Sequence, residues 1–155
     1  MSYLTLAQAK QSLGNDLYVS AYDDFTNPGT PSDTVLQEDI DYVTSVINKY
    51  LIKTYDVIGT PITATETLAI LKGYAEHILK YKAYQRFDES EVPAVVVDRY
   101  REVTDELTAV SNGTEMLPGQ AQNTLSGAVT FGFNSATNDT ESPTPIFRRT
   151  DMAGY

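Results

Sequence analysis

Residues 36–55 read LQEDIDYVTSVINKYLIKTY and carry the clearest periodic pattern in the chain. Apolar side chains recur there at steps of three and four residues, at Leu36, Ile40, Val43, Ile47, Tyr50 and Leu51. This spacing places them on one face of an α-helix of about five turns. Either Ser32 or Asp33 can cap its start, because a side-chain oxygen there accepts a hydrogen bond from an amide of the first turn. The stretch predicts an amphipathic helix that ends near Tyr55.

The flanking sequence predicts three further helices. A short one follows Thr5 and stops at Gly14-Asn15. A long one, apolar on most sides and therefore central, runs to about Phe87 after a start at Thr63 or Thr65. The last begins after Ser90 or at Glu91-Val92-Pro93, since proline is tolerated in a first turn, and Asn112-Gly113 ends it.

Residues 15–34 carry Asn, Asp, Pro, Gly and Ser without a helical period. Within them, NPGTP at 27–31 predicts a turn or loop.

After Gly113 the sequence changes character. Residues 114–145 are rich in Thr, Ser, Asn, Gly and Pro, and they enclose one short β-like run, AVTFGF at 128–133. An isolated strand leaves its backbone groups unpaired, so this run needs a partner strand or lies as an extension on a neighbour. The predicted fold is all-α: a small four-helix bundle as one domain over residues 1–113, and an extended C-terminal arm over 114–155 that is either disordered or an interaction device.

Composition excludes several classes of protein. The 155 residues contain no cysteine and one histidine, and 21 acidic residues outweigh 11 basic ones, for a net charge of -10. Zero cysteine excludes disulfides and thiolate zinc sites. An acidic surface repels phosphate, so generic binding to nucleic acids or to anionic membranes is not expected. No apolar stretch approaches the roughly 18 residues that span a bilayer.

The sequence offers few candidates for catalysis, and none is expected to act. His77 lies mid-helix without a local nucleophile or orienting carboxylate, so it is interpreted as a packing or surface residue. Asp23-Asp24-Phe25 does not match a calcium loop, and the glycines form no phosphate-binding motif. No metal, no cofactor and no enzymatic activity are therefore predicted.

Two charged features suggest contacts with partners. Glu38, Asp39 and Asp41 fall mostly off the apolar stripe, so they are expected on a charged outer face that lines a channel if the protein forms an oligomer. The terminal stretch Ile146-Phe147-Arg148-Arg149 contains the only arginine pair, and arginine and aromatic side chains are typical interface anchors. The predicted partner-binding residues of the arm are Val129, Phe131, Phe133, Ile146, Phe147, Arg148, Arg149 and Tyr155.

Several segments together resemble the phage head–tail adaptor proteins of the Mu-like type, within the wider head-completion connector superfamily. The order and spacing of the segments carry the resemblance, which covers residues 3–113 and the last ten. The matching segments are Tyr3–Ala9, Leu36–Tyr55, Pro61 followed by Leu71–Arg86, Val97–Val103 and Ile146–Tyr155.

This resemblance implies a ring of twelve subunits beneath the portal of the capsid, in the neck of the virion. Such a ring extends the DNA channel, joins head to tail, and lets DNA pass without specific binding. The implied partners are further copies of the chain, the portal protein and a tail or tail-completion protein. The implied location is the virion neck, with the host cytoplasm during assembly. The alternatives are another neck or tail-completion protein, or a small helical regulatory protein that binds a partner through its C-terminal tail.

Overall fold

The computed structural model describes residues 2–24, 27–86 and 92–120. Helices dominate these residues, which confirms the predicted all-α class. In chain order the elements are α1 (Leu6–Leu13), α2 (Asn15–Tyr22), β1 (Asp23–Asp24), β2 (Asn27–Pro31), α3 (Asp33–Leu51), α4 (Thr65–Gln85) and α5 (Ala94–Ser111).

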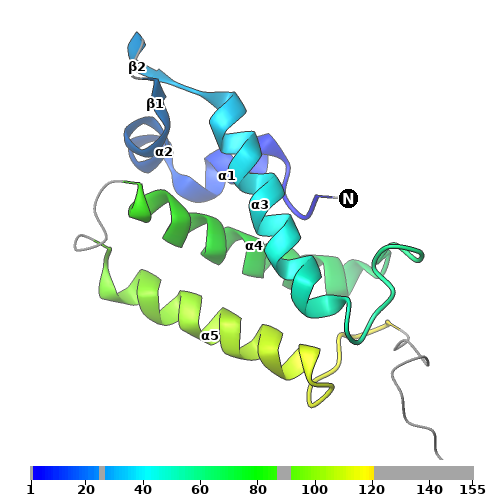
Figure 1. Ribbon diagram of the computed structural model, residues 1–155. Helices are drawn as coiled ribbons and strands as arrows, with labels where there is room; N and C mark the ends of the chain where they lie inside the picture. The colour runs from blue at the N-terminus through cyan, green and yellow to red at the C-terminus, as the bar shows by residue number, and fades with distance from the viewer. Residues whose placement is uncertain (1, 25–26, 87–91, 121–155) are drawn as a thin grey trace, which may run out of the picture.

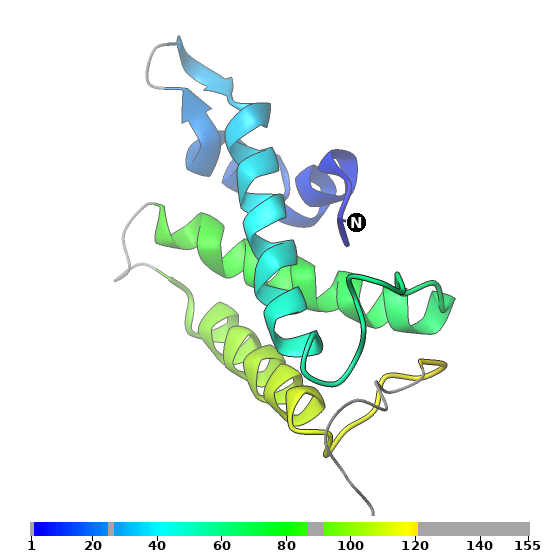
Figure 2. The ribbon, with the colours of Figure 1, turned by 45° about the vertical axis from the view of Figure 1, so that its right-hand side comes forward.

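Helices α3, α4 and α5 form the main body. α4 and α5 run antiparallel and side by side, and α3 crosses both of them (Figure 1). Figure 2 shows the same crossing from another side, with α1 and α2 packed near the start of α3. Helix α4 contacts all four other helices, so the prediction that it occupies the centre is confirmed.

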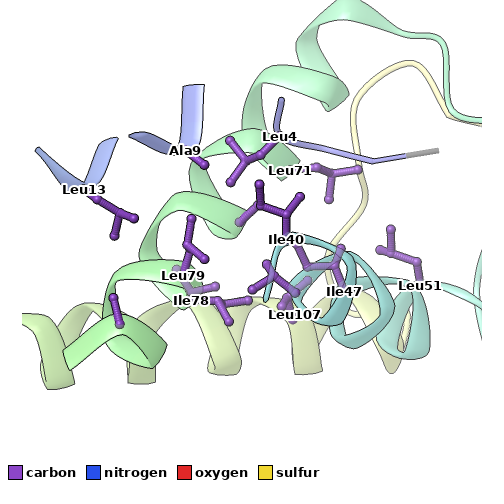
Figure 3. Packing of buried hydrophobic residues seen from close by; sticks show 14 of the residues in the cluster. Leu4, Ala9, Leu13, Ile40, Ile47, Leu51, Leu71, Ile78, Leu79 and Leu107 are labelled. Atoms are coloured by element: carbon purple, nitrogen blue, oxygen red, sulfur yellow. The ribbon is translucent and has the colours of Figure 1, made fainter. Parts of the chain in front are cut away.

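The hydrophobic core lies where these helices meet (Figure 3). The predicted α3 stripe supplies Leu36, Ile40, Val43, Ile47 and Leu51, each no more than 1% exposed. α4 adds Leu71, Ala75, Ile78, Leu79 and Ala83, and α5 adds Val103, Leu107 and Val110. Burial of these side chains is the main force that holds the helices together, because each large aliphatic residue contributes about 1.5–3 kcal/mol on leaving water.

The starts of α1 and α3 follow the predicted caps. Thr5 forms a capping box with Gln8 at the start of α1, and Ser32, one of the two residues considered, accepts from the Val35 amide at the start of α3. Gly14 ends α1 at a φ of 78°, a conformation that glycine adopts without a steric penalty. α3 ends at Leu51, four residues before the predicted limit, and the chain turns through Tyr55.

The expectation that residues 15–34 are irregular is wrong, because they form α2 and the antiparallel strands β1 and β2. Gly14 separates α1 from α2, and α2 buries only Tyr18 and Tyr22. Two buried residues in eight give too little periodicity to predict a helix. The described residues therefore form five helices where four were expected.

The predicted loop at 27–31 is strand β2, paired antiparallel with β1. Its two prolines are tolerated because a two-stranded sheet consists entirely of edges. The Asp23 carboxylate accepts a 2.6 Å hydrogen bond from the Gly29 amide. Gly29 lies within β2, where the register of the two strands is irregular, and glycine adopts its φ of 84° without a steric penalty.

The packed chain continues past Gly113. Leu117 is buried in the core cluster, and its amide donates a 2.8 Å hydrogen bond to the Tyr55 hydroxyl. The Thr67 hydroxyl donates to the Pro118 carbonyl. Residues 114–120 are thus attached to α4 and to the loop after α3.

Limited proteolysis tests the division between body and arm. We expect the first cuts between residues 121 and 145, because the backbone up to Pro118 is hydrogen-bonded to the body. Mass spectrometry of the stable fragment should show a C-terminus beyond Pro118. Early cuts within α4 would contradict the arrangement of the body.

Candidate functional site

A buried ionic cluster joins α2, α3 and α4 around the Asp39 carboxylate, whose side chain is 5% exposed. Arg86, at the C-terminal end of α4, binds both carboxylate oxygens, with Nε–Oδ2 at 2.9 Å and Nη2–Oδ1 at 3.0 Å. Lys82 Nζ lies 3.4 Å from Oδ1. The Tyr22 hydroxyl donates to Oδ2 at 3.0 Å. One carboxylate therefore connects three helices.

Aromatic rings surround the two cations of this cluster. The Arg86 guanidinium lies 5.1 Å from the centre of the Tyr22 ring, and Lys82 Nζ lies 3.6 Å from that of Tyr42. Hydrogen bonding to Asp39 raises the pKa of Arg86, so the guanidinium stays charged. Burial, followed by the negative charge of Asp39, raises the pKa of the Tyr22 hydroxyl. The hydroxyl therefore remains a hydrogen-bond donor at neutral pH.

The prediction that Asp39 belongs to a charged outer face is wrong. Asp39 follows Leu36 by three residues and precedes Val43 by four, so it lies on the buried stripe itself. A carboxylate is stable there because two cations and a hydroxyl satisfy it. Glu38 and Asp41 are exposed on α3, and only these two remain candidates for channel lining.

Two of the aspartates in residues 15–34, Asp23 and Asp33, form hydrogen bonds or ion pairs within the N-terminal part of the chain. Asp33 pairs with Lys10 at 2.7 Å and accepts a hydrogen bond from the Tyr18 hydroxyl. Asp23 of β1 accepts a hydrogen bond from the Gly29 amide of β2. Across the described ranges, no group of three or more His, Asp or Glu side chains is placed to hold a metal ion.

His77 lies at an open groove between α4 and α5. Tyr74, Arg99, Glu102 and Glu106 line the groove with it. Sequence reasoning did not find this groove, because it depends on how two amphipathic helices are set side by side.

The predicted partner-binding residues of the arm lie outside the described residues. They are Val129, Phe131, Phe133, Ile146, Phe147, Arg148, Arg149 and Tyr155. Their assignment remains a prediction from sequence. Among the helices that the structure describes, none is both long and apolar enough to span a membrane.

The fold and the described sites define a small all-α protein whose polar clusters join helices. A family model described as "Bacteriophage Mu, Gp36" matches residues 3–132, which is most of the chain. The chain belongs to this bacteriophage family, which confirms that the resemblance to Mu-like phage proteins seen in the sequence is a family relationship. The model also covers the first part of the arm, while the last ten residues lie beyond it. No curated protein and no solved structure gives a significant match.

Proposed function

We propose that this protein is a structural head–tail connector, which forms a ring under the portal, extends the DNA channel and joins head to tail. The observation that carries the proposal is membership in the bacteriophage Mu Gp36 family over residues 3–132. The resemblance noted in the sequence supplies the stoichiometry of twelve subunits and the position in the virion neck. The host cytoplasm is the proposed site of assembly.

The charge of the chain supports a channel role. The net charge is -10, and Glu38 and Asp41 stand exposed on α3. A lumen lined with carboxylates neutralises no phosphates, so it lets DNA pass without holding it. A closed ring requires a heterologous interface, in which one face of a subunit binds a different face of the next.

We also propose that the protein acts without catalysis. His77 is the only histidine of the chain, and the described residues that line its groove include no serine, threonine or cysteine to serve as a nucleophile. The nearby Tyr74 hydroxyl is a poor nucleophile at neutral pH, because burial and then hydrogen bonding to Glu106 raise its pKa.

His77→Gln tests this part of the proposal. We expect assembly to be unchanged apart from a modest packing cost, since glutamine keeps a polar side chain of similar length at a half-buried position. Circular dichroism checks the fold, and the yield of completed particles checks function. Loss of a defined chemical turnover by a folded variant would overturn the structural role.

The oligomeric state tests the connector role itself. Mass should be measured by light scattering for the protein alone and in the presence of a portal protein. A ring, or an oligomer that forms only with portal, supports the connector. Binding to tail components without portal would instead favour a neck or tail-completion protein. A strict monomer that ignores portal and binds a host factor would favour the regulatory alternative.

A further inference from the structure

The groove between α4 and α5 has the form of a site for an apolar side chain flanked by cations. Its volume is about 370 Å³, and it is open to solvent. Ala69, Ile70 and Gly73 of α4 and Val103 of α5 supply its apolar lining, and Glu102 and Glu106 of α5 add two carboxylates. Gly73 leaves this side of α4 uncovered, because a Cβ placed there meets nothing within 4 Å.

Negative charge dominates this groove. Burial, followed by the interaction with the Glu106 carboxylate and the charge of Glu115, raises the pKa of Tyr74. Arg99 pairs with Glu102 at 2.6 Å and is the one arginine or lysine among the described residues that line the groove. Glu106 has no ion-pair partner among the described residues. The groove thus retains a carboxylate that a further cation can neutralise.

The last described residues pack near the start of α4. Pro118 accepts a hydrogen bond from Thr67, and Gly73 lies six residues further along α4, a rise of about 9 Å along the helix axis at 1.5 Å per residue. Residues 121–145 then separate Gln120 from Ile146. The end-to-end distance of a random-coil chain of this length is about 25–30 Å, so 25 residues are enough to bring Ile146 to the groove of its own subunit.

We propose that residues 146–149 of the same chain, Ile-Phe-Arg-Arg, occupy this groove in the free protein. The Phe147 ring covers the apolar lining, and the guanidinium groups of Arg148 and Arg149 bind the carboxylates at the rim. No other segment of the chain has two consecutive arginines, and Phe147 directly precedes this pair. The inference concerns the isolated subunit, and it holds whether or not the proposed ring exists.

The tether favours the tail of the same chain over that of a second copy. A covalent connection of 25 residues gives the tail an effective concentration at its own groove of about the millimolar range. Dilute protein in solution lies far below that concentration. An aromatic residue between apolar walls and an arginine on a carboxylate are also the contacts that contribute most in protein interfaces.

The cysteine-free chain allows a direct test by disulfide trapping. The full-length double variant Gly73→Cys/Thr150→Cys should form an intramolecular disulfide under mild oxidation. The matched control is Ser45→Cys/Thr150→Cys, because Ser45 is exposed on α3, away from the groove. We expect the groove pair to cross-link about tenfold faster than the control, since docking raises the local concentration of the tail. Gel mobility without reductant and intact mass identify the monomeric product.

Each result decides the proposal. A fast intramolecular cross-link in the groove pair, slowed by adding Glu102→Gln and Glu106→Gln, supports it. Equal rates for the groove pair and the control would overturn it, as would cross-linked dimers alone, which assign the groove to the tail of a second copy. A rate unchanged by the two glutamines would overturn the role of the arginines. Circular dichroism of each variant confirms that the helices persist.

Discussion

Asp39→Asn is expected to lower the free energy of unfolding by about 2–3 kcal/mol, because it removes the charge that holds Arg86 and Lys82. Asparagine keeps the volume and one acceptor oxygen of aspartate. Its amide group, however, presents N–H donors to the N–H donors of Arg86, which binds both carboxylate oxygens in the native protein. At least one charge-assisted hydrogen bond is therefore lost in a site that is 5% exposed.

Asp41→Asn is the matched control for this change. Asp41 lies on the same helix two residues away, is exposed, and accepts a hydrogen bond from Gln37 at 3.1 Å. The same chemical substitution there should alter the free energy of unfolding by less than about 0.5 kcal/mol. Urea denaturation followed by circular dichroism at pH 7 measures both variants. Equal stability of the two would mean that the ionic cluster contributes nothing to the fold.

Arg86 provides an independent check on the cluster. Arg86→Met keeps much of the side chain over the Tyr22 ring but leaves the Asp39 carboxylate with Lys82 and the Tyr22 hydroxyl alone. Its effect and that of Asp39→Asn should be strongly non-additive, since both act on one interaction. A double-mutant cycle measures this coupling.

The main helices were predictable from sequence because each has a long apolar stripe. α3, α4 and α5 bury side chains at steps of three and four residues, and such a pattern has no other structural interpretation over five turns. The helix caps at Thr5 and Ser32 could also be predicted, because their side chains accept hydrogen bonds from amides only three residues away. Helix stripes and caps therefore depend on interactions between residues that are close in sequence.

Asp39 and α2 were missed because their states depend on distant residues. The residues that make Asp39 tolerable in the core lie 17 residues before it and 43 to 47 residues after it in the sequence. A charge on an apolar stripe is the one local sign of such a partner. α2 depends on packing Tyr18 and Tyr22 against other helices, so its eight residues carry little signal of their own.

One candidate site could be identified from the sequence and the other could not. The arginine pair of the tail is visible in the sequence, because it is the only such pair in the chain. The groove that we assign to it arises from the side-by-side placement of α4 and α5, and no sequence pattern in either helix reports it.

Deletion of residues 146–155 is expected to leave the helical circular-dichroism signal unchanged but to abolish stable joining of heads to tails. The last described helix ends at Ser111, so the deletion removes no residue that packs in the described core. In the assembled particle the proposed role of Phe147, Arg148 and Arg149 is contact with an adjacent subunit, portal or tail protein. One buried charge-assisted hydrogen bond contributes about 1.5–3 kcal/mol. Repeated around a ring, such contacts add through multivalency, so their joint loss is large.

A matched pair of variants separates this role from mere tail length. Arg148→Gln/Arg149→Gln should reproduce most of the loss, because glutamine keeps side-chain length and polarity but cannot form an ion pair. Thr150→Ala, adjacent in sequence, should complete particles normally. The measurement is the yield of infectious particles, with electron microscopy of separated heads and tails. Normal yield from the truncated protein would show that the tail is dispensable for joining heads to tails. Docking of the tail in the α4–α5 groove of the free subunit is a separate question, which disulfide trapping measures.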